Sequence, residues 1–279
     1  MAQLKDQVVL VTGCSSGIGL GLIRELKRRG HRPIATARRQ VSVEELDEQG
    51  FDALELDVGS AESVSRAVAQ AIERFGRIDV VINNAGFNLF GPVMEVPLTE
   101  LERLFDTNVL GLLRVSQAVF PHMAERRSGR IVNIGSVVGV LPTPFAAGYS
   151  ATKSAVHTLS DVMRQELAPL GIDVVVVQPG GVRSSIADNA AASVERFADP
   201  SSRYHALLEK IRRRAYASQA APMEADAFAR KVLEAALARR PPRRVREGRG
   251  ALALPALAKL PAPLLDRIMG LQSGLSRLR

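Results

Sequence analysis

The amino-acid sequence predicts an α/β fold built on a doubly wound parallel sheet. Short apolar runs alternate with longer segments of helical periodicity from residue 7 to residue 178. This alternation is typical of a parallel sheet with helices on both faces. The first apolar run leads directly into a glycine-rich turn, Thr12 to Gly19, and then into a helical segment. Strand, glycine turn and helix in this order indicate a Rossmann-type unit, in which backbone amides at the helix start suit a pyrophosphate.

The expected elements follow one another along the chain. Strands are expected at residues 7–11, 33–37, 53–56, 79–82, 130–134 and 172–178, with Arg243 to Arg246 as a candidate seventh strand. Helices are expected at residues 17–29, 42–48, 60–75, 99–122, 148–168 and 223–239. These elements form one domain over residues 1–250, which includes an irregular and helical substrate lid around 183–222. A C-terminal extension follows at 251–279.

Length and composition fit a single domain. The chain has 279 residues and a mass of 30.1 kDa, and α/β folds of roughly 200–250 residues are often single domains. No signal segment precedes the first strand and no apolar run is long enough to cross a membrane, so we expect a cytoplasmic protein. The one cysteine, Cys14, cannot form an internal disulfide, which suits a reducing compartment. The four histidines show no ligand spacing, so no metal is expected.

Tyr149 and Lys153 carry the clearest chemical signal. They lie four residues apart in a segment of helical periodicity, so a phenol and an ammonium group are expected on one face of a helix. A free tyrosine titrates near pH ~10. A fixed positive charge beside it favours the phenolate and lowers the pKa, which would make Tyr149 a general acid and base.

Four segments in a fixed order resemble the short-chain dehydrogenase/reductase family. They are the turn Thr12 to Gly19, the run Asn83-Asn84-Ala85-Gly86, Ser136 after an apolar strand, and Tyr149 with Lys153. Asn108 and the pair Pro179-Gly180 complete the set, and the resemblance covers residues 6–240. The segment Val9 to Gly19 is most similar to hydroxysteroid and retinol dehydrogenases. Its spacing, Gly-x3-Gly-x-Gly, differs from the Gly-x-Gly-x-x-Gly dinucleotide fingerprint.

This resemblance implies four catalytic residues. Tyr149 would protonate the carbonyl oxygen during reduction, or take the hydroxyl proton during oxidation, as hydride passes from or to the nicotinamide. Ser136 would hydrogen-bond the same oxygen, and Lys153 would hold the nicotinamide ribose and lower the tyrosine pKa. Asn108 would anchor a water that continues the proton path to solvent. Taken alone, Ser136 also fits a strand-end turn, and Asn108 a helix-interior amide.

The resemblance implies a nicotinamide dinucleotide, and the residue after the second strand favours NADP. An acidic residue there hydrogen-bonds the ribose 2′-hydroxyl of NAD, whereas an arginine neutralises the 2′-phosphate of NADP. The chain has Arg38 and no acidic residue before Glu44. Ser16 stands where the family often has a second basic residue, and Arg38 also fits a solvated surface charge. The implied cofactor-binding residues are Gly13, Ser15, Ser16, Gly17, Ile18, Gly19, Arg38, Asp57, Val58, Asn84, Ala85, Gly86, Tyr149, Lys153, Pro179, Gly180 and Val182.

Mostly apolar segments are expected to wall the substrate pocket. The candidate contacts are Leu89, Phe90, Val137, Val138 and Phe145. In the insert after Val182, apolar residues recur at helical spacing from Tyr204 to Ala215, with Arg212 to Arg214 expected on the opposite, solvated face. Such a helix would close over a large hydrophobic alcohol or ketone, or pack on the core as an ordinary amphipathic helix.

Positive charge is concentrated near the end of the sequence. The chain holds 37 basic and 29 acidic residues, a net charge of +8, and residues 240–279 hold nine basic and two acidic residues, a net charge of +7. No aromatic residues accompany these charges, so no nucleic-acid partner is expected. Recurring leucines interrupted by prolines leave three roles open for the extension: a subunit contact in a homo-oligomer, a weak membrane-surface contact, or a flap over the substrate.

Two classes of function fit these observations. The first is an NADP-dependent oxidoreductase that interconverts a hydrophobic alcohol and its ketone or aldehyde. The second is a noncatalytic NADP-sensing regulatory protein on the same fold, because a fold alone does not settle function. The intact set of Ser136, Tyr149 and Lys153 favours the enzyme, since a sensor has no chemical need of it.

Overall fold

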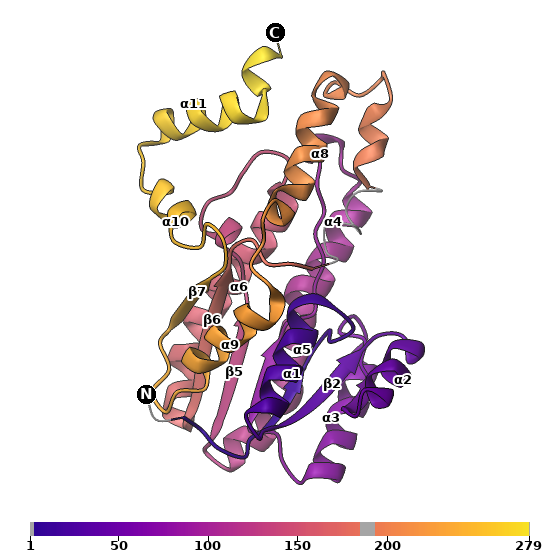
Figure 1. The fold of residues 1–279 in the computed structure, drawn as a ribbon, viewed down its shortest axis with the longest axis vertical. Helices are drawn as coiled ribbons and strands as arrows, with labels where there is room; N and C mark the ends of the chain where they lie inside the picture. Colours follow the sequence, from indigo (N-terminus) through magenta and orange to yellow (C-terminus); the bar gives the residue numbers. More distant parts are fainter. Residues whose placement is uncertain (1–2, 185–192, 279) are drawn as a thin grey trace.

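A single parallel sheet organises the protein. The computed structural model describes residues 3–184 and 193–278. In this part of the chain seven strands lie in the order β3-β2-β1-β4-β5-β6-β7 (Figure 1). The strands are β1 Val8–Val11, β2 Arg32–Ala37, β3 Asp52–Glu55, β4 Val80–Asn83, β5 Gly129–Ile134, β6 Ile172–Pro179 and β7 Arg244–Glu247. Each boundary lies within one residue of the expected strand, and the Rossmann-type doubly wound sheet is confirmed.

The order of the strands fixes where a ligand can bind. The chain moves outward from β1 through β2 to β3, then returns past β1 to β4 and continues to β7. β1 and β4 are neighbours in the sheet, but after β1 the chain continues toward one edge of the sheet and after β4 toward the other. The turns after these two strands therefore diverge. In open α/β sheets, ligands bind in the crevice at this switch point, outside the carboxyl ends of the strands.

Helices cover both faces of the sheet. They are α1 Gly17–Arg28, α2 Gln40–Glu48, α3 Ala61–Phe75, α4 Leu98–Phe105, α5 Gly111–Glu125, α6 Ala147–Leu167, α8 Leu208–Tyr216, α9 Ala225–Ala236, α10 Ala253–Leu257 and α11 Ala262–Ser273. Successive strand residues point to opposite faces. Val9 and Val11 accordingly join the cluster that contains the inner residues of α1, α2 and α9, whereas Val8 and Leu10 join the cluster beneath α3 and α5.

The helix expected at 99–122 is interrupted. Residues Asp106–Leu110 form a π-helical turn between α4 and α5. Such a turn is rare and is frequently found at functional sites. The prediction of one regular helix was wrong. The periodicity of apolar residues carries no signal for the one extra residue that a π-helical turn contains. The turn contains Asn108, whose side chain is buried.

A third apolar cluster, the lid cluster, includes the buried residues of α8, a helix that lies toward the top of Figure 1, beyond the end of the sheet. It comprises Phe90, Phe145, Ala146, Val194, Phe197, Leu207, Ile211 and Ala215. Phe90 and Phe145 come from the loops after β4 and β5, and the other aromatic member, Phe197, comes from the expected lid. Of the expected lid at 183–222, residues 185–192 lie outside the described residues.

The C-terminal extension packs on this end of the molecule. Ala251 and Pro255 are buried, and Leu275 packs against the lid cluster. Helix α11 contains no buried residue, and its Leu264 and Leu271 are exposed. None of the helices in the described ranges has the length and apolar character needed to cross a membrane. The extension is thus held at its two ends, with an exposed helix between them.

We expect truncation after Gly250 to leave the sheet folded and able to bind NADPH. The seven strands, the glycine turn and the helices on both faces of the sheet precede the cut, and the described packing loses Ala251, Pro255 and Leu275. The lid should become more sensitive to protease because Leu275 no longer packs on it. Thermal unfolding, NADPH titration and limited proteolysis measure these effects, with truncation after Arg277, which keeps Leu275, as the matched control. A protein that fails to fold would show that the extension belongs to the core.

Candidate functional site

The turn between β1 and α1 is shaped by glycines. Gly13 and Gly17 have φ angles of +71° and +56°, in the left-handed region that favours glycine. A Cβ on Gly19 would lie 2.1 Å from the carbonyl oxygen of Gly13. Helix α1 can therefore approach the turn closely because position 19 has no side chain. The structure places the expected residues Gly13, Ser15, Ser16, Gly17, Ile18 and Gly19 together in this one turn and the first turn of α1.

Hydrogen bonds join this turn to the loop after β4. The side-chain amide of Asn84 donates to the carbonyl oxygens of Thr12 and Gly13, both at 2.9 Å. In return, the Thr12 hydroxyl accepts from the backbone N–H groups of Asn84 and Ala85 at 2.9 and 3.0 Å. Thr12 was not among the expected site residues. The sequence does contain a signal for this role, because a threonine directly after a buried strand can hydrogen-bond the backbone of the neighbouring loop.

The ends of β2 and β3 lie beside this turn in the sheet. Arg38 follows β2 and is exposed, and within the described ranges no carboxylate forms an ion pair with it. Asp57 follows β3, and its carboxylate accepts from the N–H of Gly59 at 2.9 Å. The side chain of Val58 is buried. Arg38 is thus a solvated cation directly after β2.

Ser136, Tyr149 and Lys153 converge at the end of β5. The hydroxyl of Tyr149, on α6, is hydrogen-bonded to the side chain of Ser136. One helical turn later, the buried Lys153 donates from Nζ to the carbonyl oxygen of Ile134 at 2.8 Å. Nζ lies 5.7 Å from the centre of the Tyr149 ring. The spacing of four residues places both groups on one helix face, as the sequence predicts.

The electrostatics of Tyr149 differ from the expectation. Burial raises the pKa of Tyr149 to about 12, against which the Ser136 hydrogen bond and the charge of Arg214 act to lower it. Burial lowers the pKa of Lys153 to about 8. The prediction that Lys153 lowers the tyrosine pKa is wrong for the protein without cofactor, because desolvation dominates and the ammonium is directed at Ile134 rather than at the phenol oxygen.

Asn108 serves as a clamp on the loop after β4. Its Oδ1 accepts from the N–H of Phe87 at 3.0 Å, and its Nδ2 donates to the carbonyl oxygen of Phe87 at 2.9 Å and to the hydroxyl of Thr152 at 3.3 Å. A Cβ on Gly86 would lie 2.9 Å from the same Oδ1. The side chain therefore ties the π turn to α6 and to the expected Asn84-Ala85-Gly86 segment.

Arg214 does not lie on the solvated face of α8, where the sequence pattern placed it. Its Nε donates to the hydroxyl of Thr143 at 2.8 Å, and its guanidinium carbon lies 5.2 Å from the centre of the Phe90 ring. Position 214 follows Ile211 by three residues and Leu207 by seven, which is the spacing of one helix face. The expectation treated three consecutive arginines as a unit, although each step rotates a helix by roughly 100°.

The remaining expected cofactor-binding and substrate residues lie in different parts of the structure. Phe90 and Phe145 belong to the lid cluster, Leu89 and Val137 are buried elsewhere, and Val138 is half-buried in the turn after Ser136. Pro179 ends β6. A Cβ on Gly180 would lie 2.1 Å from the carbonyl oxygen of Arg249, so Gly180 allows close packing of two loops. Val182 is buried in the cluster of α1 and α9.

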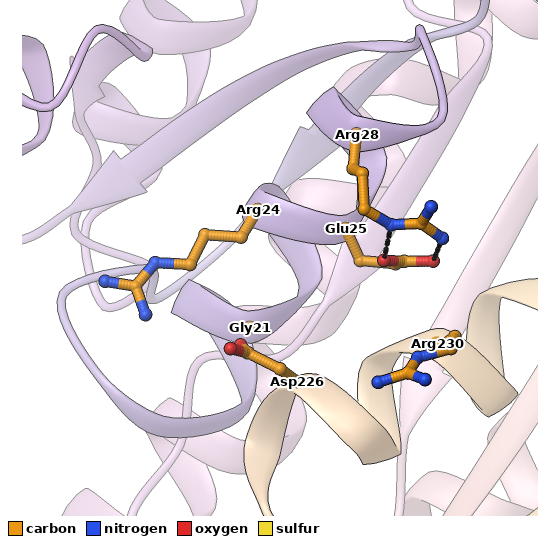
Figure 2. A pocket seen from close by; sticks show the side chains of 6 residues that line it. All are labelled: Gly21, Arg24, Glu25, Arg28, Asp226 and Arg230. Atoms are coloured by element: carbon orange, nitrogen blue, oxygen red, sulfur yellow. Dashed lines mark hydrogen bonds and ion pairs between the residues drawn. The ribbon is translucent and has the colours of Figure 1, made fainter.

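A surface hollow of about 510 Å³ lies between α1 and α9, away from these residues (Figure 2). It is lined by Gly21, Arg24, Glu25, Arg28, Asp226 and Arg230. Arg28 and Arg29 already pair with Glu25. A second hollow of about 260 Å³ reaches Gly17 and Ser184 at the glycine turn. Within residues 3–184 and 193–278, no group of three histidine, cysteine or acidic side chains could hold a metal ion.

Comparisons with known proteins identify the family and agree with the fold. A family model described as short chain dehydrogenase matches residues 7–195. The NADPH-dependent 1-acyldihydroxyacetone phosphate reductase of Schizosaccharomyces pombe is 34% identical over 209 residues, 74% of this chain and 70% of that protein. A short-chain dehydrogenase from Streptomyces avermitilis has a TM-score of 0.78 and 30% identity over 98% of both chains. The closed form of serine dehydrogenase complexed with NADP+ has a TM-score of 0.75 and 26% identity, covering 87% of this chain and 94% of that one.

We expect Lys153→Met to stabilise the protein without cofactor near neutral pH. Folding lowers the lysine pKa from 10.5 to about 8, so the unfolded chain binds more protons between these values and the wild type gains stability as pH rises through them. Below pH 8 the charged ammonium costs about 3 kcal/mol, and loss of the Ile134 hydrogen bond offsets about 1–2 of it. Chemical unfolding at several pH values should show a gain near pH 7 that fades by about pH 10. The exposed Lys231→Met is the control, and a loss of stability at every pH would contradict the prediction.

Proposed function

The chain belongs to the short-chain dehydrogenase family, and on that premise we propose that it is an NADP-dependent oxidoreductase that interconverts an alcohol and its ketone or aldehyde. The observation that carries the proposal is the hydroxyl of Tyr149, hydrogen-bonded to Ser136 at the carboxyl end of β5 with Lys153 one turn behind it. A phenol in that position can exchange a proton with a substrate oxygen.

The residues present fit a dinucleotide. The turn at Gly13, Gly17 and Gly19 is a cradle from which side chains are excluded, by positive φ at the first two and by the 2.1 Å approach at the third. A pyrophosphate fits such a turn because backbone N–H groups at a helix start favour negative charge. Gly86 and Lys153 lie on the other side of the same crevice: a Cβ on Gly86 would be 4.0 Å from Nζ. The bound cofactor supplies or accepts a hydride.

Arg38 supports the choice of NADP. It is exposed at the end of β2 and unpaired within the described ranges, so its guanidinium is available to a 2′-phosphate. The names of two similar proteins agree with this choice: the yeast reductase is called NADPH-dependent, and the serine dehydrogenase structure contains NADP+. Ser16 carries no charge at the position where the family often has a second basic residue. Arg38 would therefore provide most of the discrimination between NADP and NAD.

Proton transfer follows from the three converging residues. During reduction, Tyr149 would give its proton to the carbonyl oxygen of the substrate, and the bound cofactor would supply the hydride for the carbonyl carbon, so that the products would be an alcohol and the oxidised cofactor. A tyrosine with a pKa of about 12 is protonated at neutral pH and so is ready to act as this acid. Ser136 hydrogen-bonds the phenol and is placed to hydrogen-bond the substrate oxygen. Lys153, one helical turn later, would hold the nicotinamide ribose of the bound cofactor.

The alternative, a noncatalytic NADP-sensing protein, is not favoured. Burial of Lys153 lowers its pKa to about 8, so the protein gives up stability to keep an ammonium group there. A pocket that only bound a dinucleotide would gain nothing from placing that group beside a half-buried phenol and a serine hydroxyl. An enzyme needs a proton donor and a hydroxyl group at the substrate oxygen.

Tyr149→Phe is expected to leave folding and NADPH binding intact while lowering kcat about a hundredfold or more, because the proton donor is lost. Turnover is measured by following reduced cofactor with a carbonyl substrate, and binding by NADPH titration. Tyr216→Phe, which changes an exposed tyrosine, is the matched control. If the Tyr149 variant keeps more than about a tenth of wild-type kcat with chemistry rate-limiting, Tyr149 is not the proton donor.

Arg38→Asp is expected to weaken NADPH binding about tenfold to a hundredfold and to shift preference toward NADH, because a charge-assisted contact becomes a repulsion. Both cofactors are titrated into both proteins. Arg66→Asp makes the same change of charge on α3 and controls for the net charge of the protein. Unchanged relative affinities would mean that Arg38 does not contact the phosphate.

A further inference from the structure

Arg214 is the cation of the lid that faces the active site. It projects from α8 toward the loops after β4 and β5, where Nε bonds Thr143 and the guanidinium packs over Phe90. Its charge acts on Tyr149, where it favours the phenolate. Burial lowers the pKa of Arg214 itself. The lid thus brings a partly buried positive charge to the catalytic phenol.

This charge has no counter-ion in the described part of the chain. The neighbouring Arg212 pairs with Glu195 and Glu209, and Arg213 is exposed to solvent. For Arg214, by contrast, the described residues provide one acceptor, the Thr143 hydroxyl. A guanidinium group has five N–H donors, and the four on its terminal nitrogens form the planar fork that binds carboxylate or phosphate.

Keeping such a group near the site has a free-energy cost. A partly buried cation without a partner is destabilising, and a glutamine or leucine would fill the same position on α8 without it. The Thr143 hydrogen bond and the Phe90 ring hold the guanidinium in one orientation, which reduces the entropy lost when an anion binds. These features are typical of a side chain that is preorganised for a ligand.

We propose that Arg214 binds an anionic group of the substrate, a carboxylate or a phosphate ester, so that the enzyme prefers carbonyl compounds that carry such a group near the reacting carbon. The inference rests on the proposed oxidoreductase function and narrows its substrate class. The apolar residues around Phe90 and Phe145 then contact the remainder of the substrate. Arg214 determines specificity and does not take part in proton transfer.

A second effect of Arg214 must be separated from binding. Removing its charge also raises the pKa of Tyr149, which would slow alcohol oxidation whatever the substrate carries. The reduction direction at neutral pH avoids this difficulty, because Tyr149 is fully protonated there in the wild type and in the variant. A loss of activity that is confined to anionic substrates then reports on binding of the anionic group by Arg214.

The test compares matched substrates in NADPH-dependent reduction at neutral pH. Short-chain oxo acids are paired with their methyl esters, and dihydroxyacetone phosphate with dihydroxyacetone, so that the two arms distinguish carboxylate from phosphate. The variants are Arg214→Gln, Arg214→Lys and the exposed control Arg213→Gln. The wild type should favour the anion of at least one pair about tenfold to a hundredfold in kcat/KM, mostly through KM. Arg214→Gln should abolish this preference, Arg214→Lys keep part of it, and Arg213→Gln retain it.

Two results would overturn the proposal. One is equal loss of activity on acid and ester in Arg214→Gln, which indicates a structural or purely electrostatic role. The other is a wild type that prefers the neutral partner of every pair while its activity still depends on Tyr149, which leaves the oxidoreductase function intact. If no pair is reduced, thermal unfolding of the NADP+-saturated protein with each acid decides the matter. Stabilisation that depends on Arg214 supports the anion site even though the proposed reaction fails, and its absence rejects the site.

Discussion

The site depends on the contact between the turns after β1 and β4. The strand order makes these two strands neighbours while their chains diverge, and four hydrogen bonds cross the gap. The Asn84 amide donates to the carbonyl oxygens of Thr12 and Gly13, and the Thr12 hydroxyl accepts from the N–H groups of Asn84 and Ala85. These bonds satisfy backbone groups that would otherwise face an open crevice. They also set the separation between the glycine turn and the loop that Asn108 clamps to α6. The glycine turn, the Asn108 clamp and α6 are therefore joined by one continuous set of hydrogen bonds.

Much of this arrangement could be predicted from local sequence. Strand boundaries were accurate because buried parallel strands are short apolar runs bounded by polar or glycine residues. The glycine turn, Ser136, Tyr149 and Lys153 were predicted as a site because several segments occur together in a fixed order, and the structure brings the last three together at the end of β5. Three features were not predicted from the sequence, and the reason is the same for each: the feature depends on its three-dimensional surroundings. The π turn at Asn108 needs one extra residue in a helix, the inward Arg214 needs the helix phase, and the high pKa of Tyr149 needs its desolvation.

Two cations surround the catalytic phenol, and they act differently. Lys153 is buried beneath the ring, where Ile134 fixes its position, and its own pKa falls. Arg214 approaches from the lid, and its charge opposes the rise in the pKa of Tyr149. The first is on α6, which packs against the sheet, and the second is on a helix that packs through the separate lid cluster. If the two proposals hold, proton transfer and substrate selection depend on different parts of the chain.

The lid cluster has a consequence for how the protein is made. Its members Phe90 and Phe145 precede β6, but Leu207 and Ile211 come after it and Leu275 follows every strand of the sheet. During synthesis the chain emerges from its N-terminus, so residues 3–247, which contain all seven described strands, are available before Leu275 is. The nascent chain can therefore complete its sheet before the last residue of the lid cluster's surroundings has been added.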